Sequence, residues 1–240
     1  MWTGWDVLAI LLLTLAAVVF FVAAITLALK WLVYPDAGFT NLMMRHPLIV
    51  VGAQTLAYFV VLTFMAVLVR YARGRPFWSA IRWNWPKKWW PYFAGGTALS
   101  MGLQLLARLL PIPKSLPIDE FFHTPAEAWA LAVFGVTLAP LMEELFFRGF
   151  LYPVLARRLG VTAGVLLTSL GFALIHADQL GKAWAPVFVV FLVGVALTVV
   201  RAVTKSVAAG VLMHCAYNGT IFALMFVYTG GFRHLERLSQ

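Results

Sequence analysis

Seven apolar segments, each long enough to cross the hydrocarbon core of a membrane, limit what this chain can fold into. A helix needs about 20 predominantly apolar residues to cross a bilayer. The segments cover residues 7–32, 48–69, 92–110, 126–155, 161–177, 186–203 and 206–228. Because a backbone inside lipid must satisfy its own hydrogen bonds, each segment is predicted to be helical. The expected fold is all-α, a polytopic transmembrane helix bundle of about seven spans.

The composition of the chain is that of a membrane protein. Its 240 residues are 62% hydrophobic and 11% charged, whereas soluble proteins are about 45–50% apolar and about 25% charged. Since the spans must pack on one another to bury their polar groups, residues 1–240 are expected to form a single integral membrane domain. The first apolar segment is longer than the core of a signal peptide, about 7–15 residues, so it is expected to remain as a span.

The basic residues predict how the chain lies in the membrane. The net charge is +9, but the basic residues sit mainly in the connections between spans, where they contact lipid headgroups, so no nucleic-acid partner is expected. With the N-terminus inside, 11 of the 18 Lys and Arg residues fall in inner connections, which predicts a cytoplasmic N-terminus. We expect an integral membrane protein that contacts membrane lipids. The single cysteine, Cys215, excludes an intramolecular disulfide.

Two connections carry structural signals of their own. Residues 70–93, RYARGRPFWSAIRWNWPKKWWPYF, are basic and rich in tryptophan, which predicts a loop or amphipathic helix at the membrane interface. The alternative is a role in gating substrate entry. In the stretch TPAE, Thr124 is the expected N-cap of the fourth span, with Pro125 in its first turn and Glu127 completing a capping box.

Three short patterns place polar residues at membrane depth, where each charge costs roughly 2.5–3.5 kcal/mol on insertion scales. The patterns are Glu143-Glu144-x-x-x-Arg148, Phe172-x-x-x-His176 and His214-x-x-x-Asn218. Residues four apart share one face of a helix, so Glu144 is predicted to pair with Arg148, and His214 lies on the same face as Asn218. Glu143 is about 100° further round and faces a different neighbour. We therefore expect the two glutamates to have separate functions.

Depth within the bundle can be estimated from the predicted turns. Glu143 and His176 are each roughly 24–26 Å from the turn at residues 158–160, so their side chains should lie level. His214 is roughly 13 Å from Lys205 and is predicted nearer the inner face, unless tilt or a break near Gly149 closes the difference. Pro140 cannot donate to the carbonyl of Val136 and is expected to kink the fourth span.

A carboxylate beside an imidazole can act as a general base. In this interpretation Glu143 and His176 activate a water for attack on a carbonyl, and Asn218 with protonated His214 donates to the oxyanion. The expected reaction is amide hydrolysis without a covalent intermediate or a cofactor. The structural alternative treats these groups as an ion pair and interhelical hydrogen bonds.

Other chemistries fit the sequence less well. The zinc-protease signature H-E-x-x-H is absent, although Glu143, His176 and His214 would be the ligands if zinc were bound. Ser169 lies about two turns before His176 and is a weak nucleophile candidate. Cys215 follows His214 directly, and neighbours on a helix point about 100° apart, so it is expected to be a packing residue.

The three patterns, in this order on successive spans, resemble the CAAX prenyl protease and bacteriocin-processing family of intramembrane glutamic-type endopeptidases. The context APLMEELFFRGFLYPVL is also similar to that family's first motif, and the resemblance covers residues 140–218. It implies a catalytic core at about residues 124–228. It implies Glu143 as the base, His176 as its partner, and His214 with Asn218 as the oxyanion site. Glu144 and Arg148 would position and support them.

The sequence leaves three functions open. The first is an endopeptidase that cleaves a membrane-associated peptide or protein tail. The second is a non-catalytic bacteriocin-immunity or peptide-binding protein that uses the same cavity. The third, a proton-coupled carrier, is disfavoured because transport sites usually lie between internal repeats, and the sequence has no visible repeat.

Overall fold

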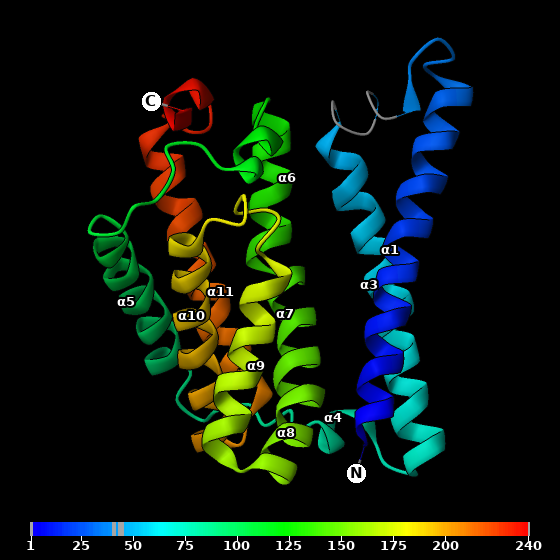
Figure 1. Ribbon diagram of the computed structural model, residues 1–240, viewed down its shortest axis with the longest axis vertical. Coiled ribbons are helices and arrows are strands. Elements are labelled where there is room, and N and C mark those ends of the chain that lie inside the picture. The colour runs from blue at the N-terminus through cyan, green and yellow to red at the C-terminus, as the bar shows by residue number, and fades with distance from the viewer. Residues whose placement is uncertain (1, 40–41, 43–45, 240) are drawn as a thin grey trace. The chain divides into compact units, whose positions relative to one another are not determined.

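The computed structural model describes residues 2–39, 42 and 46–239, and every regular element in this part of the chain is a helix (Figure 1). Contacts between residues divide it into two compact units, Met1–Phe77 and Trp78–Gln240. Each unit has its own internal packing, and the single domain expected from the sequence stays a prediction.

The first unit contains two long helices, α1 (Gly4–Leu32) and α3 (Pro47–Val67), which pack on each other. The turn η1 (Leu68–Ala72) continues α3 as a π-helix. Thr3 caps α1 in a capping box with Asp6, whose carboxylate also accepts a hydrogen bond from Arg73 just after η1. This partly buried ion pair joins the start of α1 to the end of η1.

The second unit contains the remaining helices, and each of its predicted spans coincides with one or more of them. In chain order they are α4 (Phe77–Ala80), α5 (Trp90–Ala107), η2 (Pro117–Phe121), α6 (Pro125–Val136), α7 (Leu138–Glu144), η3 (Leu145–Leu151), α8 (Tyr152–Leu159), α9 (Val161–Ile175), α10 (Trp184–Thr204), α11 (Val207–Tyr228) and η4 (Leu235–Ser239). Within this unit α5 packs on α11, α9 packs on both α8 and α10, and α6 packs on α11.

The described helices confirm the predicted all-α membrane fold. Five helical segments are long and apolar enough to cross a membrane: Gly4–Leu32, Pro47–Tyr71, Pro125–Leu159, Trp184–Thr204 and Val207–Tyr228. The two other predicted spans correspond to α5 and to α9, an apolar helix of 15 residues. The chain is therefore an integral membrane protein.

The fourth predicted span is not one kinked helix but a rod interrupted twice (Figure 1). It starts as expected, because Thr124 and Glu127 form the predicted capping box. It breaks first at Thr137, where φ is −117° and ψ is −76°, because Pro140 has no N–H for the carbonyl of Val136. A π-helix, η3, then begins directly after the glutamate pair.

The π-helix leaves one backbone carbonyl without a partner on its own helix. The N–H of Tyr152 donates to Phe147, five residues earlier, as a π-helix requires. The next bond of the same pattern would run from residue 153 to Arg148, but Pro153 has no N–H. The carbonyl of Arg148 instead accepts a hydrogen bond from Nε of Arg201 on α10, at 3.0 Å.

The connection at residues 81–84 is held against the start of α11. The carbonyl of Arg82 accepts from the N–H of Val207 at 3.1 Å. The side chain of Asn84 donates to the carbonyl of Lys205 at 3.3 Å, and the hydroxyl of Ser206 donates to the carbonyl of Asn84. This part of the tryptophan-rich segment is thus an ordered loop, as the first interpretation predicted, and the gating alternative stays untested.

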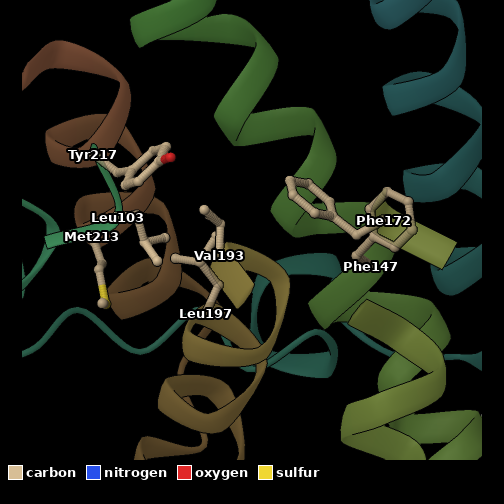
Figure 2. Packing of buried hydrophobic residues seen from close by; sticks show 7 residues of the cluster. All are labelled: Leu103, Phe147, Phe172, Val193, Leu197, Met213 and Tyr217. Carbon is tan, nitrogen blue, oxygen red and sulfur yellow. The ribbon is translucent and has the colours of Figure 1, made fainter. Parts of the chain in front are cut away.

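A cluster of buried apolar side chains joins five elements of the second unit. Its members are Leu103, Phe147, Phe172, Val193, Leu197, Met213 and Tyr217, which come from α5, η3, α9, α10 and α11 (Figure 2). The rings of Phe147 and Phe172 meet edge to face, with centroids 5.3 Å apart. Because interiors are close-packed, this core fixes the depth of each helix relative to its neighbours.

Candidate active site

The predicted pair of Glu144 and Arg148 lies fully buried between helices. Nη1 of Arg148 donates to Oε1 of Glu144 at 2.7 Å, and neither side chain is exposed. A buried ion pair is stable only when its remaining donors and acceptors also find partners. Arg148 meets this condition, since Nε donates to the hydroxyl of Thr198 at 3.2 Å and Nη2 donates to the carbonyl of Gly194 at 2.9 Å.

Glu143 points to a different set of neighbours, as its position on the helix predicted. Its Oε1 is 3.9 Å from Nε2 of His176, and its Oε2 is 3.7 Å from Nε2 of His214. Both distances are too long for a direct hydrogen bond. The side chains of Glu143 and His176 are 16% and 23% exposed, so a small molecule can reach them. The side chains of Glu144 and Arg148 are fully buried.

The partners of the two imidazoles define which ring nitrogens carry protons. Nδ1 of His176 lies 2.8 Å from the carbonyl of Phe172, and Nδ1 of His214 lies 3.2 Å from Oε1 of Glu144. Both partners only accept, so each Nδ1 must donate. In a neutral ring the Nε2 atom then holds a lone pair, and both Nε2 atoms face Glu143.

The depth predicted for His214 was wrong. It lies level with both glutamates and not nearer the inner face. The estimate assumed an unbroken α-helix, whereas η3 is a π-helix that includes Gly149. The level placement of Glu143 and His176 was confirmed.

The second oxygen of Glu144 lies against a glycine. Oε2 is buried and has no hydrogen-bond partner among the described residues. A Cβ atom on Gly210 of α11 would lie 2.6 Å from it, closer than real Cβ contacts allow. Gly210 therefore lets the carboxylate approach the backbone of α11, which places Oε1 beside His214, four residues further along that helix.

Phe172 connects three members of the site. Its carbonyl accepts from His176, its ring centroid is 4.7 Å from the Cζ atom of Arg148, and the ring meets that of His214 edge to face at 5.7 Å. A cation over a desolvated aromatic face gains about 2 kcal/mol. The sequence pattern marked Phe172, but its several contacts come only from the packing of α9 against η3 and α11.

Asn218 makes a contact that the sequence did not predict. Its Nδ2 donates to the carbonyl of Gly135, near the end of α6, at 2.7 Å. The amide therefore holds α11 to the broken rod just before the interruption at Thr137. The structure brings together Glu143, Glu144, Arg148, His176 and His214, and the recorded bond of Asn218 leads away from them.

The alternative nucleophiles lie outside this group of contacts. The hydroxyl of Ser169 is buried and donates to the carbonyl of Val165 at 2.7 Å. Cys215 is half-buried.

The zinc alternative stays a prediction. In the described part of the chain, no group of three or more His, Cys, Asp or Glu side chains is arranged to hold a metal ion. Glu143, His176 and His214 converge, with 3.7 and 3.9 Å between the carboxylate oxygens and the Nε2 atoms.

Several residues that complete the site lie outside the predicted set, namely Phe172, Gly194, Thr198, Arg201 and Gly210. Three of them are on α10, a helix for which the sequence predicted no role in the site. The available signal was the pair of polar residues Thr198 and Arg201 in an apolar helix. Arg201 was instead interpreted as a charge of the inner connection.

The comparisons with known proteins match the core of this site. Residues 125–220 match the family described as Rce1-like, the type II CAAX prenyl endopeptidase Rce1-like family. No curated protein and no solved structure matches the chain. The matched range contains all three polar patterns and runs from the first turn of α6 to residue 220, beyond the middle of α11. Over these residues the chain is similar to the Rce1-like family of type II CAAX prenyl endopeptidases, as its motifs indicated.

Proposed function

We propose that the protein is a glutamate-dependent intramembrane endopeptidase that hydrolyses a peptide bond in a membrane-associated peptide or protein. The observation that carries the proposal is the position of Glu143 between two imidazoles. Its two oxygens face Nε2 of His176 and Nε2 of His214 at 3.9 and 3.7 Å. The match to a family of endopeptidases supports the same reaction class.

The gap between Glu143 and His176 suits a water that donates one proton to each acceptor. Because Nδ1 of His176 is bonded to the carbonyl of Phe172, its Nε2 is left to accept. Both protons of the water are then engaged, and an oxygen lone pair is left to attack a carbonyl carbon. Positioned general bases of this kind contribute about 10²- to 10⁴-fold to rate.

Proton transfer in this reaction is balanced by the same residues. Glu143 takes a proton as the water oxygen bonds to the carbonyl carbon, and it returns that proton to the amide nitrogen as the C–N bond breaks. The second proton of the water stays on the acyl product, so the products are a carboxylic acid, which then releases that proton to solvent, and an amine. His214, when protonated, donates from Nε2 to the tetrahedral oxyanion, while the Glu144 carboxylate balances its charge from the Nδ1 side.

The substrate, the cellular site and the orientation belong to the proposal as well. The sequence favours a peptide or protein tail held at the membrane surface, a bacterial inner membrane and a cytoplasmic N-terminus. The partly exposed side chains of Glu143 and His176 support a site that a peptide can enter.

The experiment is cleavage by the full-length protein, purified in detergent. A peptide library is presented with and without a farnesylated cysteine, with and without a chelator, and products are identified by mass spectrometry. The variants are Glu143→Gln and His176→Ala, with Glu120→Gln and His123→Ala as controls, since both control side chains are exposed. We expect cleavage by the wild type and both controls, with a loss of about 10²-fold or more in Glu143→Gln.

Two results would contradict the proposal. Full activity in Glu143→Gln would remove the mechanism. Binding of a peptide without cleavage, unchanged in Glu143→Gln, would favour the non-catalytic peptide-binding function. Inhibition of cleavage by the chelator would support the zinc alternative.

A further inference from the structure

Helix α10 presents one face to Arg148. Gly194, Thr198 and Arg201 are spaced four and three residues apart, which places them on the same side of the helix. Each contacts Arg148, through a backbone carbonyl, a hydroxyl and a guanidinium respectively. None of the three lies in the sequence patterns that suggested the site.

The side chain of Arg148 and the hydroxyl of Thr198 form a closed set of hydrogen bonds. The hydroxyl of Thr198 donates to the carbonyl of Gly194 at 2.7 Å. That carbonyl also accepts from Nη2 of Arg148, while Nε of Arg148 donates to the Thr198 oxygen at 3.2 Å. Because the Thr198 proton is directed at Gly194, a lone pair faces Arg148. Because a hydroxyl is both a donor and an acceptor, Thr198 can donate to Gly194 and accept from Arg148 at the same time.

The backbone of Arg148 is held by the same helix. Its carbonyl, which Pro153 leaves without a donor on the rod, accepts from Nε of Arg201. Arg201 is itself 5% exposed. Arg148 is therefore fixed at its main chain and at two nitrogens of its side chain before it contacts Glu144.

These contacts lead in a line to the proposed catalytic groups. The hydroxyl oxygen of Thr198 accepts a hydrogen bond from Nε of Arg148, and Nη1 of Arg148 donates to Oε1 of Glu144. The same carboxylate oxygen accepts from Nδ1 of His214. A guanidinium that is free to rotate would move Oε1 of Glu144, and with it the imidazole that faces Glu143. Small misplacements of such groups reduce rates strongly.

We propose that Thr198 is a positioning residue of the active site, which fixes Arg148 so that Glu144 holds His214 in place. This inference rests on the proposed peptidase function. Thr198 does not contact the reacting groups, so its removal should slow the chemical step and leave substrate binding nearly intact.

The test compares Thr198→Val with Thr198→Ser, using the peptide that the wild type cleaves best. Valine keeps the shape and removes the hydroxyl, whereas serine keeps it. We expect Thr198→Val to lower kcat about 10- to 100-fold, as the loss of a hydrogen bond to a charged group implies, with KM changed by less than about 2-fold. Thr198→Ser should stay within about 3-fold of the wild type.

Thr55→Val is the matched control. Thr55 lies in α3, and its hydroxyl donates to a carbonyl four residues earlier, as that of Thr198 does. We expect its activity to equal that of the wild type. Equal kcat in Thr198→Val and Thr55→Val would overturn the proposal, as would a loss in Thr198→Val that serine does not restore.

A double-mutant cycle shows whether Thr198 acts through Arg148. Arg148→Lys keeps the charge but has no Nε donor for the hydroxyl. Thr198→Val should therefore lower kcat much less in this background than in the wild type. Equal losses in both backgrounds would overturn the proposal.

The same cycle can be measured by thermal unfolding, which separates this inference from the proposed function. We expect Thr198→Val to lower the unfolding midpoint in the wild type and to have a smaller effect in Arg148→Lys. If no peptide is cleaved, the proposed function fails while this coupling is still measurable. Additive shifts of the midpoint would refute the contact itself.

Discussion

Nδ1 of His214 lies 3.2 Å from Oε1 of Glu144, the same oxygen that accepts a hydrogen bond from Arg148. One carboxylate oxygen thus connects a buried cation to an imidazole on another helix. Glu143, its neighbour in sequence, faces Nε2 of the same imidazole. The two glutamates therefore face opposite edges of His214, and the adjacent acids have different partners because they point to different helix faces.

The first prediction separates these two glutamates. Glu144→Gln leaves Arg148 as a buried cation without a counter-charge, which costs about 3–5 kcal/mol. We expect a lower midpoint of thermal unfolding together with a loss of cleavage. Glu143→Gln, whose side chain is partly exposed, should lose cleavage but keep its midpoint. A Glu144→Gln variant as stable as the wild type would show that the pair with Arg148 does not stabilise the fold.

The second prediction concerns Phe172. Phe172→Leu keeps the backbone carbonyl that holds His176 but removes the ring that covers Arg148 and meets His214. We expect the free energy of unfolding to fall by about 1–3 kcal/mol, with a lower kcat. Phe188→Leu is the control, because Phe188 is 41% exposed. Equal midpoints of the two variants in a thermal melt would contradict this account.

The third prediction uses two glycines of α11. Gly210→Ala places a Cβ 2.6 Å from Oε2 of Glu144, whereas Gly219→Ala meets its nearest neighbour, Val136, at 3.6 Å, an ordinary contact. We expect Gly210→Ala to displace the carboxylate, lower the unfolding midpoint and abolish most cleavage. Gly219→Ala should keep the unfolding midpoint and the cleavage rate of the wild type. If both variants cleave at the wild-type rate, the close approach of Glu144 to α11 is not required.

The fourth prediction tests the two roles of Asn218. Its side chain donates to the carbonyl of Gly135, so Asn218→Ala should remove about 1 kcal/mol of stability. We expect the midpoint of thermal unfolding to fall more clearly than kcat. A kcat reduced about 10²- to 10³-fold at an unchanged midpoint would instead support the oxyanion role that the family resemblance implies.

Local patterns in the sequence were enough to predict the elements of this fold. Hydrophobic length alone predicted a helix in each of the seven apolar segments, five of which are long and apolar enough to cross a membrane, because a backbone in lipid must satisfy its hydrogen bonds within its own segment. The Thr124–Glu127 capping box and the Glu144–Arg148 pair were also predicted correctly. Both depend on side chains three or four residues apart, whose geometry is set by the helix itself.

The tertiary structure decided how these elements meet. Packing between helices far apart in sequence placed His214 level with the glutamates, brought Gly210 against Glu144, and set Thr198 and Arg201 of α10 on Arg148. The interruption at Thr137 and the π-helix after Glu144 changed the register of the whole rod. No local pattern encodes such contacts, because a side chain's partner on another helix depends on the depth and rotation of both helices, which only their shared packing determines.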